Sequence, residues 1–157
     1  FSQEVLPRLW VEVPDAHFHI VGQSPSPRLD PLRGERRITI TGRVDDVRPY
    51  IAAADVYVVP LRVGGGTRLK VLEAMAMGRA LVSTGLGIEG LGASDGRELL
   101  VANDAEAFAR RILDLLRDEA RRDTLGRAAR AFVEQRYGWE RIGPLLETAY
   151  TRPAVAR

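Results

Sequence analysis

Short apolar runs alternate with longer amphipathic segments along the chain. The runs are rich in Val, Ile or Leu and end in turn residues; they lie at 17–21, 37–41, 55–59, 80–84 and 98–102. Such runs are typical of strands covered on both faces, as in a parallel sheet. The remaining segments carry apolar residues at helical spacing, which predicts helices at 2–13, 47–53, 67–77, 104–117, 120–136 and 139–150.

This alternation predicts the fold class. Strands that alternate with helices imply right-handed crossover connections, so we expect an α/β fold with a doubly wound parallel sheet. A length of 157 residues suits one domain, and we expect residues 1–157 to form a single Rossmann-like domain. Domains of this kind normally begin with a strand, whereas this chain begins with the helical segment 2–13. We therefore expect one strand of the sheet to be absent from the sequence.

Composition and charge narrow the choice of partners. The absence of cysteine excludes a disulfide scaffold, a zinc–thiolate site and a Cys nucleophile, and agrees with the reducing cytoplasm, where we expect the protein. No apolar stretch approaches the ~20 residues that a membrane span needs. The 23 basic residues are nearly balanced by 21 acidic ones. In the C-terminal half they mix at helical spacing, which indicates a solvated helix face and no nucleic-acid partner.

The loop after the third predicted strand is the most informative segment. Residues 63–78 read VGGGTRLKVLEAMAMG. Three consecutive glycines leave the backbone free to turn its N–H groups inward, and we expect Thr67 to cap the helix that follows. A glycine-rich loop that leads into a helix N-terminus favours a bound anion such as phosphate. The alternative is a flexible turn without a ligand.

Glu73 stands among apolar neighbours in this segment. We expect the helix to be mostly buried, and a carboxylate there needs partners. One possible partner is a cation, either Lys70 or Arg79. The other is a sugar cis-diol, whose two hydroxyls donate hydrogen bonds to the carboxylate. The residues alone leave both interpretations open.

A second glycine-rich segment follows the fourth predicted strand. Residues 85–90 match the spacing G-x-G-x-x-G of dinucleotide-binding loops. That fingerprint must open a helix, yet residues 91–97 are rich in Gly, Ser and Asp. We therefore expect 85–90 to be a loop that lines the same cleft, with a nicotinamide dinucleotide site as the alternative.

Residues 64–84, GGGTRLKVLEAMAMGRALVST, with GIEGL at 87–91, resemble a known family. They are similar to the C-terminal, nucleotide-binding half of family 4 (group 1) glycosyltransferases, which have the two-domain GT-B fold. Further matches are FHIVG at 18–22 and the Tyr137-Gly138-Trp139 segment. The resemblance covers almost the whole chain.

The resemblance implies a role for individual residues. Glu73 would bind the ribose hydroxyls of the donor nucleotide, the backbone at 66–69 would hold its diphosphate, and Lys70 would add charge nearby. The family's other glutamate, which contacts the transferred sugar, falls on Gly65. The donor-binding residues expected in this way are Arg43 and Val44, which border the base, and Gly65, Gly66, Thr67, Arg68, Leu69, Lys70 and Glu73.

The resemblance also implies an activity. The full enzyme would transfer a hexose from a nucleoside-diphosphate sugar to a glycan, lipid or polysaccharide acceptor, with retention of configuration and without metal or cofactor. The acceptor-binding N-terminal half and an upstream Arg/Lys pair lie outside this sequence, so we expect weak donor binding and no transfer by this half alone. The missing strand would lie between those at 17–21 and 55–59, where omitted residues or a strand-exchanged dimer would supply it.

Three other functions fit parts of the sequence. The first is a GT-B nucleotide-sugar 2-epimerase, and the second is an NAD-dependent oxidoreductase that uses residues 85–90. The third is a non-catalytic module that binds nucleotide sugars.

Overall fold

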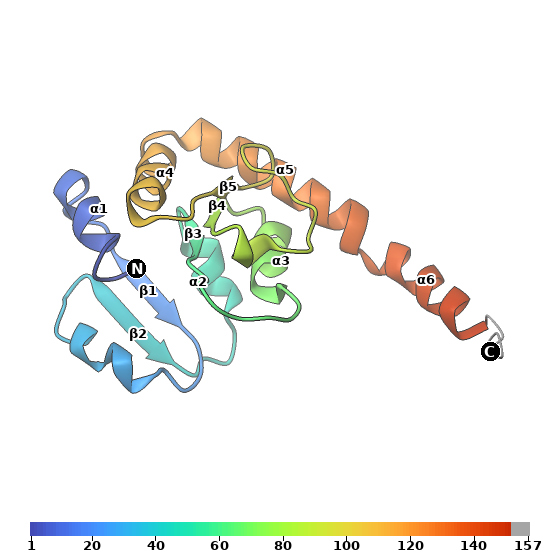
Figure 1. The fold of residues 1–157 in the computed structure, drawn as a ribbon, viewed down its shortest axis with the longest axis horizontal. Coiled ribbons are helices and arrows are strands. Elements are labelled where there is room, and N and C mark those ends of the chain that lie inside the picture. The colour runs from blue at the N-terminus through green and yellow to red at the C-terminus, as the bar shows by residue number, and fades with distance from the viewer. Residues whose placement is uncertain (152–157) are drawn as a thin grey trace.

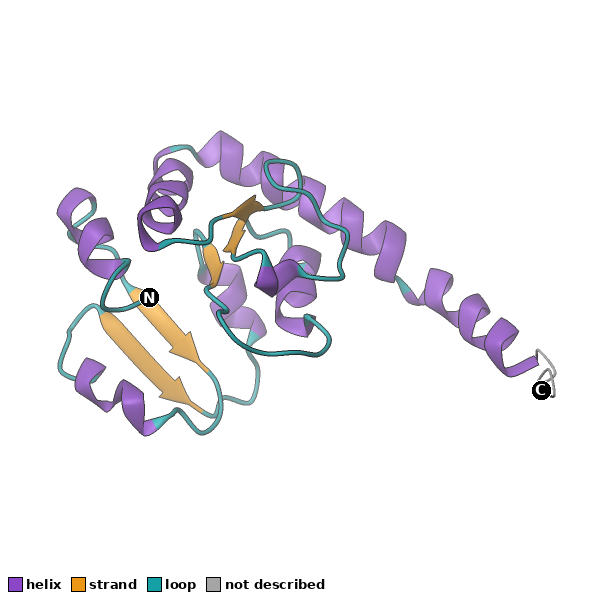
Figure 2. Cartoon of the chain, in the orientation of Figure 1, coloured by secondary structure: helices purple, strands orange, loops and turns teal. Residues whose placement is uncertain are grey.

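Parallel strands and helices alternate through most of the molecule, which confirms the α/β class. The structure is a computed structural model that describes residues 1–151. The strands are β1 (Phe18–Val21), β2 (Ile38–Gly42), β3 (Tyr57–Val59), β4 (Leu81–Ser83) and β5 (Leu100–Val101) (Figure 1). The helices are α1 (Leu6–Glu12), α2 (Arg48–Ala53), α3 (Leu69–Ala76), α4 (Ala105–Arg117), α5 (Glu119–Tyr137) and α6 (Trp139–Thr151), with short 3-10 turns at Pro27–Leu32 and Leu86–Ile88 (Figure 2).

The strands form two parallel sheets. One sheet contains β1 and β2, and the other has the order β3–β4–β5. Figure 1 shows β1 on the side of its sheet that is nearer to β3. The described residues place no strand between β1 and β3, which is where the sequence leads us to expect an additional one. The supply of that strand by another segment or chain stays a prediction.

Alternate residues of the three-stranded sheet face two different helical layers. Val82 of β4 and Leu100 of β5 belong to the apolar core that includes Phe108, Ile112 and Leu115 of α4. Leu81 of β4 belongs to a second core, against which Val59 of β3 and Val101 of β5 pack and which α2, α3 and α5 cover. Helices on both faces make this sheet doubly wound, as the continuous apolar runs predict.

Helices α4 and α5 each begin at an aspartate that caps the helix. The Asp104 carboxylate accepts a hydrogen bond from the Ala107 amide at 2.8 Å, and the Asp118 carboxylate accepts one from the Arg121 amide at 2.9 Å. Such caps satisfy amides that lack a partner within the helix. Helix α6 follows α5 after Gly138 and extends away from the rest of the molecule (Figure 1). Within residues 1–151, no helix has the length and apolar character that crossing a membrane requires.

Helix α3 packs tightly between β4 and α5. Its residues Val71, Ala74 and Met75 are fully buried. The close approach depends on Gly126 of α5, because a Cβ atom there would overlap with the carbonyl oxygen of Gly78, just beyond the end of α3. Backbone therefore meets backbone at this point, and α3 has a fixed position.

We expect Gly126→Ala to lower the free energy of unfolding by about 1–3 kcal/mol, the usual cost of overpacking a tight contact. Gly143→Ala is the matched control, since Gly143 is also helical and has no atom within 4 Å of an added Cβ. Urea denaturation followed by circular dichroism measures both changes. Equal unfolding midpoints for the two variants would contradict the close contact.

Candidate functional site

The glycine-rich loop reaches α3 by a tight turn. Gly64 and Gly66 have φ angles of 140° and 91°, which residues with a side chain rarely adopt. The Leu69 amide then donates to the Thr67 carbonyl oxygen at 2.9 Å. The expected Thr67 cap is therefore wrong: Arg68 occupies the N-cap position, and no side chain caps the helix.

Several amides of this loop have no hydrogen-bond acceptor. The amides of Val71 and Leu72 donate to the Arg68 carbonyl oxygen. Among the described residues, no acceptor is found for the amides of residues 64–68 or of Lys70. Unpaired amides at a helix N-terminus attract anions, because the helix dipole adds positive charge there.

A cleft of about 660 Å³ lies beside the loop. It is bounded by the start of α3, the turn after β4 and the junction of α5 with α6. Its lining residues are Gly66, Thr67, Arg68, Leu69, Leu72, Glu89, Gly90, Leu91, Tyr137, Trp139 and Ile142. The two glycine-rich segments therefore do line one cleft.

One wall of the cleft is formed by residues of α5 and α6 that are not among the site residues expected from the sequence. The Tyr137 hydroxyl donates to the Leu91 carbonyl oxygen at 3.0 Å and ties the end of α5 to the turn after β4. Trp139 and Ile142 continue this wall into α6. The sequence does contain a signal for this wall: Gly138, between the aromatic residues Tyr137 and Trp139, interrupts the helical pattern.

Arg68 places a buried positive charge at the cleft. Its side chain is only 8% exposed. The Nη2 atom lies 3.4 Å from a carboxylate oxygen of Glu89 and 3.5 Å from the Gly64 carbonyl oxygen, while Nε is buried without a partner. A buried guanidinium with so few good hydrogen bonds is costly, so an additional anionic partner would stabilise it.

Glu73 is exposed, and the expectation that it lies on a mostly buried helix is wrong. Its apolar neighbours Val71, Ala74 and Met75 turn to the opposite face of α3. Glu73 forms no ion pair within residues 1–151, and Arg79 instead donates to the Ala52 carbonyl oxygen at 3.1 Å. The carboxylate is thus open to hydroxyl donors from a ligand.

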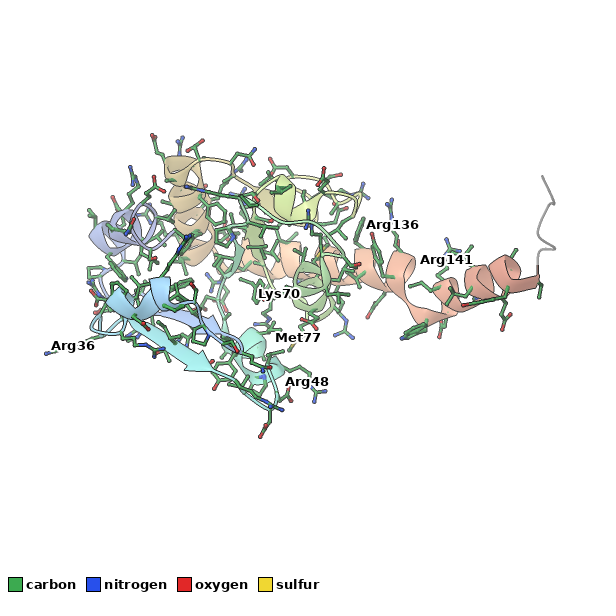
Figure 3. All side chains as sticks on the ribbon, turned by 60° about the horizontal axis from the view of Figure 1, so that its bottom comes forward. Arg36, Arg48, Lys70, Met77, Arg136 and Arg141 are labelled. Atoms are coloured by element: carbon green, nitrogen blue, oxygen red, sulfur yellow. The ribbon has the colours of Figure 1, made fainter. Side chains whose placement is uncertain are left out.

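Glu73 and Lys70 lie on a side of α3 that does not border the cleft. Burial raises the pKa of Tyr57 in β3, and the negative charge of Glu73 raises it further. Figure 3 shows Lys70 on the side of α3 that faces α2, whereas Arg136 and Arg141 lie near the α5–α6 junction.

Arg43 and Val44 immediately follow β2, and neither lines the cleft. The structure therefore gathers residues 66–69 of the expected site in the cleft and leaves Arg43, Val44, Gly65, Lys70 and Glu73 outside it. The roles of all nine expected residues stay predictions.

The segment 85–90 does not have the form of a dinucleotide loop. The Gly85 amide donates to the Asn103 side chain at 2.8 Å, and the Gly87 amide donates to the Thr84 hydroxyl at 3.1 Å. The amides of Ile88 and Glu89 are bonded within the turn, which forms a short 3-10 turn where the fingerprint needs an α-helix. These amides are occupied, which disfavours the oxidoreductase interpretation.

Comparison with known proteins agrees with this geometry. A family model described as "Glycosyl transferases group 1" matches residues 1–118. The chain belongs to this glycosyltransferase family. A phosphatidyl-myo-inositol mannosyltransferase of Mycolicibacterium smegmatis is 30% identical over 152 residues, which cover 92% of this chain and 39% of the relative.

Solved glycosyltransferase structures share the fold. Anabaena HepE in complex with UDP and glucose aligns with a TM-score of 0.80 and 18% identity, over 96% of this chain and 44% of HepE. The C-terminal domain of a group 1 glycosyltransferase from Francisella tularensis aligns with a TM-score of 0.63 and 16% identity, over 83% of this chain and 91% of that domain. The chain spans about two fifths of the length of the curated relatives it matches.

We expect a nucleoside diphosphate to slow hydrogen exchange at amides 64–70 of this glycosyltransferase chain by about tenfold or more, and to affect amides 85–90 much less. The unpaired amides of the first segment gain acceptors from the diphosphate, whereas several in the second already have them. Mass spectrometry of exchanged peptides measures the difference. Protection centred on 85–90, and caused by NAD, would favour the oxidoreductase instead.

Proposed function

We propose that this chain is the donor-binding half of a glycosyltransferase that moves a hexose from a nucleoside-diphosphate sugar to a glycan, lipid or polysaccharide acceptor. The observation that carries the proposal is the set of unpaired amides at 64–68 and Lys70, at the N-terminus of α3. Two cations, Arg68 and Lys70, stand at the same helix start. This combination suits a diphosphate.

The same groups suit the chemistry of transfer. When the bond between sugar and diphosphate breaks, negative charge develops on the departing phosphate oxygen. Fixed amides, the helix dipole and nearby cations stabilise that charge more in the transition state than in the bound donor. The proposal includes transfer without a metal ion and with retention of configuration, both of which come from the resemblance to the family.

Glu73 completes the proposed nucleotide site. It lies one helical turn beyond Leu69 and has no ion-pair partner within the described residues. An unpaired carboxylate can accept hydrogen bonds from both hydroxyls of a ribose. Arg43 and Val44 would border the base on the β2 side.

The remaining parts of the reaction require other residues. Gly65 has no side chain with which to contact the transferred sugar, so recognition of the sugar falls to neighbouring groups. The mannosyltransferase named above acts on a phosphatidylinositol acceptor, which supports hexosyl transfer to a lipid as one form of the reaction. Residues beyond the matched two fifths of such relatives would bind the acceptor.

We expect calorimetry of the chain to detect binding of at least one of UDP, GDP and ADP, and Glu73→Gln to weaken that binding by about 1–3 kcal/mol through loss of charge-assisted hydrogen bonds to the ribose. Glu106→Gln is the matched control, since Glu106 is exposed on α4 and pairs only with Arg110. Unchanged affinity in a folded Glu73→Gln variant would remove Glu73 from the site. Binding of NAD with no response to the three nucleoside diphosphates would contradict the proposed function.

We also expect the isolated chain to bind donor nucleotide but to transfer no sugar, because in the proposed reaction the acceptor is bound by residues outside the part of the relatives that this chain matches. Release of nucleoside diphosphate from labelled sugar donors, with a mixture of lipid and glycan acceptors, measures transfer. Turnover by residues 1–157 alone would show that this half contains the whole catalytic apparatus.

A further inference from the structure

The guanidinium of Arg68 is buried more deeply than its partners account for. Its side chain is 8% exposed, yet its one carboxylate contact, to Glu89, is 3.4 Å long and involves a single nitrogen. Its Nε atom is buried without a partner. Elsewhere in the chain, Arg37 forms a two-pronged pair with Glu35, at 2.9 Å from both Nε and Nη2, although both side chains are one-third exposed.

We propose that the Arg68 side chain binds the diphosphate directly, and that Glu89 is a substitute counter-ion which the diphosphate displaces. This inference rests on the proposed function and adds to it a direct contact from the Arg68 side chain and a role for Glu89. In this proposal the buried Arg68 side chain binds the anion, and the exposed Glu89 carboxylate competes with the anion for Arg68.

The start of α3 carries an excess of positive charge. Arg68 stands at the N-cap and Lys70 lies in the first turn, which contains no acidic residue. A helix N-terminus already carries partial positive charge, so cations are unfavourable there. The unpaired amides of residues 64–68 add to this excess. Two added cations, one of them buried, indicate that the site lacks a negative partner.

The shape of the guanidinium suits a phosphate group as its partner. A guanidinium offers a planar fork of N–H donors that matches two oxygens of a phosphate group, with Nε as one prong. Glu89 satisfies only one prong, and only at 3.4 Å. In the proposed complex, a phosphate group accepts hydrogen bonds from the guanidinium and from amides of the loop. It therefore suits Arg68 better than Glu89 does.

The Glu89 side chain is free to leave Arg68. Its side chain is 70% exposed and its residue lines the same cleft as Arg68. It follows the Leu86–Ile88 turn and forms no other ion pair within the described residues. Glu89 can therefore swing into solvent without disturbing the core, and any anion that binds Arg68 must compete with it.

The test measures binding of inorganic pyrophosphate and of a nucleoside diphosphate to Glu89→Gln and Arg68→Lys by calorimetry. We expect Glu89→Gln to bind both ligands about three- to tenfold more tightly, because the competing charge is gone. We expect Arg68→Lys to bind both about tenfold more weakly, because a lysine has no fork. Arg110→Lys is the control, since Arg110 is exposed on α4, and it should leave both affinities unchanged.

Arg68→Lys also replaces a buried side chain and can lower stability. Glu89 is exposed, so the affinity gain expected for Glu89→Gln is measured on an intact fold. Nucleotide binding that neither substitution changes would overturn the inference and leave the proposed function standing. Pyrophosphate binding that follows the expected pattern, with no nucleotide bound, would support the inference and contradict the proposed function. No binding of either ligand to any variant would overturn both.

Discussion

The contact between α3 and α5 determines where the cleft lies. Gly126 allows the backbone of α5 to touch that of Gly78, two residues beyond α3, while Val71, Ala74 and Met75 anchor α3 in the core. With α3 fixed, its N-terminus is held next to the turn after β4 and the end of α5. A loop of three glycines would otherwise have many conformations, so the rigid helix behind it supplies the precision that a binding site needs.

Helix α3 then serves two surfaces with different chemistry. Its N-terminus, with the buried Arg68, faces the cleft and is suited to negative charge. Its exposed face carries Lys70 and Glu73, neither of which lines the cleft. A diphosphate and a ribose are adjacent in any nucleotide, so one short helix can contact both if the ligand lies across its first turns.

The sequence predicts features that depend on neighbouring residues better than features that depend on packing. Asp104 is foreseen as a helix start because an aspartate directly precedes a clear apolar stripe. Thr67 fails as a cap because the backbone of Gly66 directs the chain into a turn that ends at Arg68. Glu73 is misjudged because Leu72 and Ala76 are apolar but stand on partly or fully exposed positions.

The aromatic wall of the cleft is harder still to foresee. Tyr137 meets Leu91 across 46 positions of sequence, and no local pattern encodes that contact. The pairing of the parallel strands follows from the alternation of runs, but the division into two sheets does not. Short runs such as β3 look alike whether or not a neighbouring strand completes them.

That division has a consequence for how the molecule responds to temperature. No strand ladder of the described residues joins β1 to β3, so side chains such as Phe18 and Val58, which pack against a common core, hold the two sheets together. Association of apolar surfaces weakens on cooling. The contacts at the boundary between the sheets should therefore lose strength on cooling, and the strand ladders within each sheet do not replace them.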